Sequence, residues 1–165
     1  MADVQDVAAY ILRQCGQMST WKLQKLAYYC QAWHLVWDDV PLFNARIEAW
    51  PNGPVVVDLY RNHRGRFSVD VWPLGDPSKL SKSERATIDI VIEDYGALTG
   101  RQLSHLTHAE DPWREARGGL PATAYSNNEI TPSALQSYYS ALDEAEDATA
   151  VDELDWTDWE DVDLD

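Results

Sequence analysis

The sequence lacks the features that mark secreted, membrane-spanning and disulfide-bonded proteins. Its 165 residues include only two cysteines, Cys15 and Cys30, so a disulfide framework is not expected. No stretch approaches the roughly 18 apolar residues that a membrane span needs. The N-terminal residues carry acids instead of a basic start and a long apolar run, which argues against a signal peptide. We therefore expect a cytoplasmic protein with no membrane partner.

Sequence motifs for catalysis and for metal or cofactor binding are equally scarce. The eight glycines are scattered through the chain and form no phosphate-binding loop. Cys30 and His34, like His105 and His108, are one helical turn apart, but zinc needs three or four ligands and nothing completes either set. A Cys–His nucleophile pair would also use Cys30, which we expect to pack in the core as an inert thiol. The sequence predicts no metal, no cofactor and no catalytic residue.

Basic residues are absent from the C-terminal end of the chain. The net charge is −15, yet residues 143–165 hold twelve acids and no Lys or Arg. The remaining residues, 1–142, hold all 13 bases against 16 acids, so they are nearly neutral. Like charges at this density repel one another and disfavour a packed core. We expect one domain over 1–142, followed by an acidic tail over 143–165 that is disordered or becomes ordered on partner binding.

The body has the apolar periodicity and capping residues of a mainly α, compact multi-helix domain. Capping-box spacing occurs twice, at Ser81 with Glu84 and at Thr99 with Gln102. The helix after Ser81 is predicted to be the central buried one. Helices are expected from Val4 to about Gln14, from a cap at Ser19 or Thr20 to about Trp37, and from Pro54 to about His63. Two more should follow the capping boxes, one carrying Ile88 to Tyr95 and one carrying Leu103 and Leu106. A short helix should start at 110–113 and end at Gly118-Gly119, and a last one should open at Pro132 and carry Leu142. A short two-stranded ribbon is predicted between 46–50 and 67–72.

The second predicted helix carries two neighbouring stripes. Apolar residues at steps of three and four form one stripe, which we expect to face the core: Leu23, Leu26, Cys30, Trp33 and Trp37. The other stripe contains Lys22, Lys25 and Tyr29. We expect this second stripe to face water or a partner protein.

A basic cluster follows the third predicted helix, and it consists of Arg61, His63, Arg64 and Arg66. Such cations can contact nucleic acid, or they can solvate a helix C-terminus and favour its dipole. The net negative body and the acidic tail disfavour binding to phosphates, so direct nucleic-acid binding is not expected. A third alternative is that the cluster receives an acidic segment, including the protein's own tail.

Two tryptophans in the acidic tail distinguish it from a plain solubilising extension. Trp156 and Trp159 are three residues apart and could anchor one face of a segment that folds on binding. Neighbouring carboxylates, such as Asp155, Glu160 and Asp161, could steer the segment toward a basic surface. A partner-binding role and a solubilising role remain equal alternatives.

Three segments together resemble the Panacea domain of the SocA-like family, whose members are often phage-associated. The segments are KLQKLAYYCQAWHL (22–35), IEAWPNGPVVVDLYRNHRGRFSV (47–69) and LTHAEDPWREAR (106–117). Most shared residues have a structural interpretation: Leu residues pack, Gly53 frees the backbone, and Trp50 and Trp113 fill the core. The shared residues are Lys22, Leu23, Lys25, Leu26, Tyr28, Tyr29, Glu48, Trp50, Gly53, Pro54, Val55, Leu59, Tyr60, Glu110, Pro112 and Trp113.

The resemblance implies a helical antitoxin of a toxin–antitoxin system, with phage defence as its setting. It would neutralise a cognate protein toxin, encoded next to it, by direct binding and occlusion. One alternative is a proteolytic adapter that delivers the toxin to a cytoplasmic AAA+ protease. Another alternative is a small hydrolase using His105 or His108 with Glu110. We predict a binding protein and not an enzyme.

Overall fold

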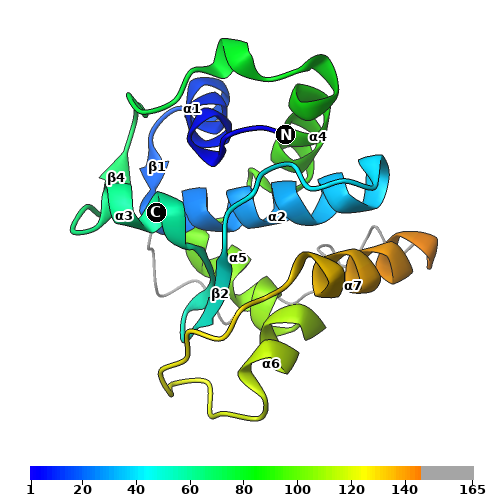
Figure 1. Ribbon diagram of the computed structural model, residues 1–165. Coiled ribbons are helices and arrows are strands. Elements are labelled where there is room, and N and C mark those ends of the chain that lie inside the picture. The colour runs from blue at the N-terminus through cyan, green and yellow to red at the C-terminus, as the bar shows by residue number, and fades with distance from the viewer. Residues whose placement is uncertain (146–165) are drawn as a thin grey trace.

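The computed structural model describes residues 1–145, and in this range the chain is mainly helical, as predicted (Figure 1). Residues 146–165 of the predicted tail lie outside the described residues. No helix within 1–145 has the length and apolarity to cross a bilayer. The helices are α1 (Val4–Cys15), α2 (Thr20–Asp38), α3 (Val57–His63), α4 (Lys82–Tyr95), α5 (Gly100–His108), α6 (Asp111–Arg117) and α7 (Pro132–Glu144). The strands are β1 (Met18–Ser19), β2 (Ile47–Trp50), β3 (Gly53–Val56) and β4 (Ser68–Val69), and a 3-10 helix, η1, covers Pro77–Lys79.

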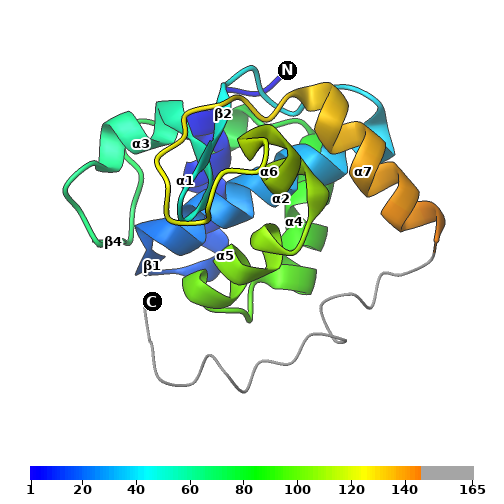
Figure 2. The same cartoon turned by 90° about the horizontal axis from the view of Figure 1, so that it is seen from below.

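Helix α2 forms the centre of the molecule, and α1, α4, α5, α7 and strand β3 all pack against it. In both ribbon views it runs through the middle of the fold (Figures 1 and 2). The prediction that α4 is the central helix is therefore wrong. Helix α4 buries Ile88 and Val91 on one side but leaves Ile90 41% exposed. Its apolar stripe covers one face, whereas α2 is covered on nearly all sides.

Helix ends follow the local signals in the sequence. The Ser19 hydroxyl accepts a hydrogen bond from the Lys22 amide at the start of α2. Both predicted capping boxes are present, at the starts of α4 and α5. Gly118 takes the left-handed conformation that ends α6. These signals involve residues two to four positions apart, so the sequence alone is enough to predict them.

Strand pairing differs from the prediction. Strand β2 pairs antiparallel with β3, and β4 pairs with β1, so the predicted ribbon between 46–50 and 67–72 does not form. Pro54 lies in β3 opposite Ala49 instead of opening a helix, and α3 begins only at Val57. Val55 and Val56 favour extended backbone. Both polar backbone groups of Val56 also bind the Gln24 side chain, which holds this residue out of the helix.

The second stripe of α2 is buried, contrary to prediction. Lys25 is 2% exposed and Tyr29 is fully buried, while Lys22 is half-buried. Strand β3 covers Lys25, whose ammonium donates to the Pro54 carbonyl. Tyr29 stacks on Tyr95 of α4 with ring centroids 4.2 Å apart. The prediction failed because helix periodicity identifies an apolar face but does not reveal that neighbouring elements cover the polar face too.

The core contains a buried carboxylate held by tyrosines. Oε1 of Glu110 accepts hydrogen bonds from Tyr29 Oη at 2.6 Å and from Tyr139 Oη at 2.8 Å. Tyr139 Oη lies 3.1 Å from Tyr28 Oη. These contacts join α2 and α7 to the residue that precedes α6. Burial raises the pKa of Glu110 to about 7, although the two tyrosine hydrogen bonds lower it in part.

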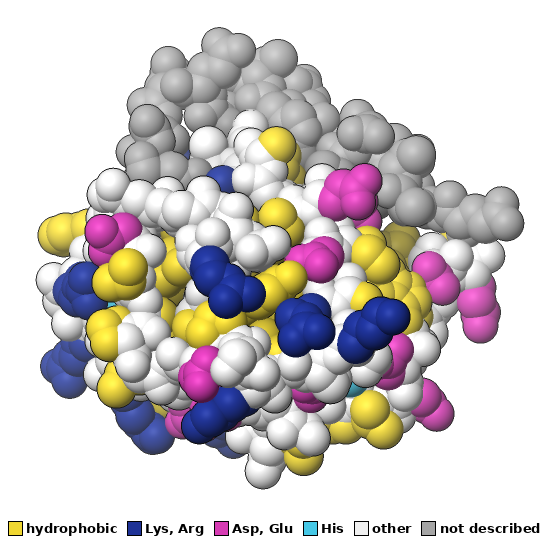
Figure 3. All heavy atoms as spheres, turned by 90° about the horizontal axis from the view of Figure 1, so that it is seen from above, with side chains coloured by type: hydrophobic (Ala, Val, Ile, Leu, Met, Phe, Trp, Pro, Cys, Tyr) yellow, Lys and Arg dark blue, Asp and Glu magenta, His cyan; other side chains and the backbone are white. Residues whose placement is uncertain are grey.

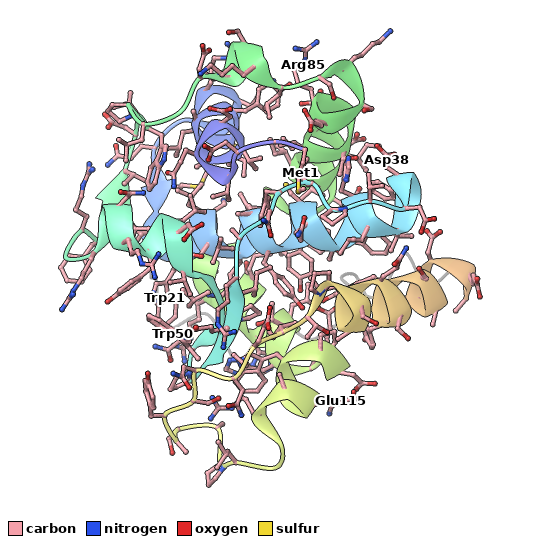
Figure 4. The ribbon with its side chains drawn as sticks, viewed as in Figure 1. Met1, Trp21, Asp38, Trp50, Arg85 and Glu115 are labelled. Carbon is pink, nitrogen blue, oxygen red and sulfur yellow. The ribbon has the colours of Figure 1, made fainter. Side chains whose placement is uncertain are left out.

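Replacing Glu110 with Gln should change how stability depends on pH. The folded pKa lies above the ordinary value of 4.5, so the wild-type carboxyl supports folding when protonated, and that support declines as pH rises from about 4.5 to 7. Relative to E110Q, the free energy of unfolding of the wild type should fall by about 3 kcal/mol between pH 4 and pH 8. Denaturant unfolding at several pH values measures this difference. Glu115→Gln, at an exposed site on α6 (Figure 4), is the control and should follow the wild-type profile. If the profiles of E110Q and the wild type run parallel, the raised pKa is wrongly assigned to Glu110.

Candidate partner-binding groove

A groove of about 440 Å³ lies at the N-terminal end of α2. Its walls come from α2, the β2–β3 turn, α3 and the loop from α3 to β4. Trp21 of α2 and Trp50 of β2 lie on this side of the molecule (Figure 4). The lining residues are Ser19, Thr20, Trp21, Gln24, Lys25, Trp50, Pro51, Asn52, Val55, Tyr60, His63, Gly65, Arg66 and Phe67.

Aromatic side chains dominate the walls of the groove. Trp50 packs edge-to-face on Tyr60 with centroids 4.8 Å apart, and its indole N–H donates to Glu48 at 2.9 Å. The expectation that Trp50 fills the core is therefore wrong, because it is half-buried and lines the groove. Phe67 is 91% exposed at the edge. Exposed aromatic rings around a preformed hollow are typical of protein-binding surfaces.

Lys25 crosses the floor of the groove beneath Gly53. Its ammonium donates to the Pro54 carbonyl at 3.1 Å and lies 5.7 Å from the centre of the Trp21 ring. A Cβ at position 53 would approach Lys25 Cε to 2.8 Å, and Gly53 has φ +113°. Only glycine meets both conditions. Burial lowers the pKa of Lys25 to about 7.

Gln24 and His63 hold the back of the groove in place. The Gln24 amide accepts from the Val56 N–H at 2.7 Å and donates to the Val56 carbonyl at 3.1 Å, which fixes its orientation. Its Nε2 lies 2.9 Å from Nε2 of His63. His63 must therefore accept there and is neutral, in agreement with a pKa lowered mainly by burial. His63 is buried, so its assignment to the exposed basic cluster is wrong.

The other members of the basic cluster are exposed arginines. Arg66 lines the groove, whereas Arg61 and Arg64 do not. Arg61 forms an ion pair with Asp58 at 3.2 Å. The loop continues from Phe67 to the exposed side chains of Val71 and Leu74. Figure 3 views the molecule from the side of α1 and α4. On that face, Lys and Arg side chains lie beside apolar ones.

The structure brings together only part of the predicted partner-binding set. Lys25 lies in the groove, with Arg61 and Arg64 nearby on α3 and after it. Tyr29 belongs to the Glu110 cluster instead, and Lys22 does not line the groove. The remaining predicted residues lie outside the described range: Asp155, Trp156, Trp159, Glu160 and Asp161.

Sequence reasoning missed Trp21, Tyr60 and Phe67 as wall residues of the groove. No short motif contains all three, because they come from α2, α3 and the loop after α3. The available signal was the high content of eight Trp and eight Tyr. That count predicts either a core or a partner surface, without assigning individual residues to one of them.

The side chains proposed for a hydrolase do not point into one common site. The Glu110 carboxylate binds the Tyr29 and Tyr139 hydroxyls, His105 is exposed, and His108 stacks on Trp113 with centroids 3.9 Å apart. Burial lowers the pKa of His108 to about 4, and partial desolvation of the His105 ring, with the nearby Arg101 cation, lowers the pKa of His105 to about 4. Within residues 1–145, no three His, Cys, Asp or Glu side chains gather as a metal site. Cys30 is fully buried in the core, as expected.

Replacing Gly53 with Ala should destabilise the protein by more than the same change at Gly119. Both glycines have positive φ, but only Gly53 has a side chain within contact of the added Cβ. The added Cβ would lie 2.8 Å from Lys25 Cε and 3.0 Å from Thr107 Oγ1, and this crowding should lower the free energy of unfolding by about 1–3 kcal/mol beyond the loss for Gly119→Ala. Denaturant unfolding of both variants measures the difference. Equal losses would mean that Lys25 does not lie beneath residue 53.

The described groove and core can be compared with known proteins. No curated protein and no solved structure matches the chain. A family model described as antitoxin SocA-like, Panacea domain, matches residues 23–114. The matched range contains Trp50, Tyr60 and Phe67 of the groove and Glu110 of the buried cluster. Because the match covers more than half of the 165 residues, the chain belongs to the SocA-like antitoxin family with the Panacea domain.

Proposed function

We propose that this protein is an antitoxin that neutralises a cognate protein toxin by direct binding, with the groove at the N-terminal end of α2 as the contact surface. The family match supports the antitoxin role. The observation that carries the choice of surface is Phe67, an aromatic side chain that is 91% exposed beside an aromatic-lined hollow. Covering an exposed phenyl ring with a partner is favourable, because it removes apolar surface from water.

The rigidity of the groove favours tight binding. Its back wall is fixed by the hydrogen bonds of Gln24 to Val56, and its floor is fixed by the contact of Lys25 with Pro54. A partner that docks here does not have to order these side chains first. Preorganised surfaces retain more of the free energy of contact, because less conformational entropy is lost on association.

In this proposal the protein acts by occlusion and not by catalysis. The bonding of Glu110 to two core tyrosines supports this, because it removes the carboxylate from the candidate hydrolase residues His105 and His108. The proposed partner is a toxin encoded next to this protein, and the proposed compartment is the cytoplasm. An adapter for an AAA+ protease would bind the same toxin, but neutralisation would then require the protease.

Replacing Phe67 with Ala should weaken toxin binding by roughly 30-fold, the effect of losing one aromatic contact of about 2 kcal/mol. Because Phe67 is so exposed, its removal should leave the Tm unchanged. Calorimetric titration with the purified neighbouring gene product gives the Kd, and co-expression gives protection from toxicity. Trp37→Ala, at a 37% exposed site near the other end of α2, is the matched aromatic control and should bind normally.

Equal affinities for the two variants would exclude the groove as the contact surface. A neighbouring gene product that is harmless alone, or that stays toxic beside this protein, would contradict the antitoxin role itself. Co-expression in a protease-deficient host separates occlusion from delivery. Continued protection there supports occlusion, whereas loss of protection with unchanged binding would identify an adapter.

A further inference from the structure

Basic side chains line the groove of a chain that has a strongly negative net charge. Lys25 and Arg66 line it, whereas Asp and Glu side chains do not. In residues 1–145, the Pro54 carbonyl is the one hydrogen-bond acceptor that the buried Lys25 ammonium reaches, and no carboxylate lies within ion-pair distance of it. An ammonium has three N–H donors. The floor of the groove therefore has hydrogen-bonding capacity for an anionic group.

The shape and the charge of the groove together define a suitable occupant. Trp21, Trp50 and Tyr60 offer ring faces and edges to an aromatic side chain. Lys25 and Arg66 offer donors to a carboxylate beside that side chain. A volume of about 440 Å³ is large enough for an indole together with a neighbouring acidic side chain. The complementary peptide thus has tryptophan directly next to Asp or Glu.

We propose that the protein's own residues 146–165 occupy this groove through Trp156 and Trp159. This segment has ten acids and no bases. Asp155 precedes Trp156, and Asp158 and Glu160 flank Trp159, so each indole has a carboxylate beside it in the sequence. The segment therefore matches the groove in both aromatic character and charge.

The segment is also long enough to reach the groove. Helix α7 lies along the C-terminal half of α2, where Gln136 donates to the Leu35 carbonyl at 3.0 Å. Helix α7 continues about 13 Å from Gln136 to Ala145, and the groove lies at the other end of α2, a helix of 19 residues that is about 28 Å long. The path along both helices is therefore about 41 Å at most. An extended chain from Ala145 can place Trp159 up to about 48 Å away. Docking within one molecule is thus geometrically feasible and benefits from a high effective concentration.

Self-docking would give the antitoxin a competitor for its own binding surface. In the free protein the acidic segment would cover the groove and its cations, and a toxin would have to displace it. A segment docked 90% of the time would weaken the apparent toxin affinity about tenfold. This competition rests on the proposed function, whereas the docking itself does not.

Paramagnetic broadening in the full-length protein tests the docking directly. A nitroxide is attached at Thr157→Cys in a Cys15→Ser background, because Cys30 is buried and unreactive. The amide signals of Trp21, Gly65 and Phe67 should broaden. A 1:1 mixture of spin-labelled ¹⁴N protein with unlabelled ¹⁵N protein should show no broadening, because docking occurs within one molecule.

Charge reversal supplies the matched control. Arg66→Glu should reduce the broadening at the groove, as should 0.5 M salt, because both weaken attraction to the acidic segment. Arg114→Glu, at an exposed arginine of α6, should leave it unchanged. Three outcomes would each overturn the proposal: no broadening in the parent protein, broadening only in the mixed sample, or equal effects of the two charge reversals.

Toxin affinity tests the consequence of docking separately. The full-length W156A/W159A variant should bind the toxin about tenfold more tightly than the wild type. If broadening occurs but the variant binds the toxin with wild-type affinity, the docked segment does not compete and that part of the proposal is wrong. If broadening occurs and no toxin binds either protein, docking stands and the proposed function fails.

Discussion

Hydrogen bonds from buried side chains of α2 to the backbone of the following loop and of strand β3 are the interactions on which the rest of the structure depends. Gln31 accepts from the Leu42 and Phe43 amides and donates to the Phe43 carbonyl, so it organises the loop after the helix. Gln24 does the same for Val56 in β3. A buried backbone group without a partner costs about 1–3 kcal/mol. Each glutamine therefore supplies partners that the loop, or the two-stranded sheet of β2 and β3, does not supply by itself. The fold is consequently built around a helix whose polar side chains are as structural as its leucines.

The sequence was a sufficient guide wherever structure arises from residues close together in the chain. Caps, helix periods and glycine stops depend on spacings of two to four residues. The capping boxes at Ser81 and Thr99 form as predicted, Ser19 is the cap of the two candidates Ser19 and Thr20, and Gly118 ends α6. Strand partners could not be predicted in this way, because the pairing of β1 with β4 joins residues about fifty positions apart. Local preferences do not determine which short extended segments meet. Pro54 was assigned to a helix because proline often begins one. The hydrogen bonds of the Gln24 side chain to Val56 instead keep this segment extended.

The candidate site was predicted less well than the fold, for a related physical reason. Long polar side chains on a helix are usually interpreted as solvent-exposed, yet Lys25 and Tyr29 have partners on other elements and are buried. The groove walls come from helix, hairpin and loop, so their juxtaposition appears only after folding. The family resemblance included several of these positions, among them Trp50 and Tyr60, but gave them structural interpretations. Their roles in lining a hollow became visible only when Lys25 was located beneath the hairpin.

The double hydrogen bond between Gln24 and Val56 makes the hairpin intolerant of changes in length. One residue added or removed within β3 would rotate Val56 by one pleat and send its buried side chain to the opposite face. The segment after α6 is held differently, since the buried Arg117 guanidinium binds the carbonyls of Pro121 and Ala124, and Gly118 and Gly119 have open space around them. Insertions and deletions among relatives should therefore occur at Gly118–Gly119 and not within 53–56. An epitope tag inserted by design should likewise be tolerated at Gly118–Gly119 and not within 53–56.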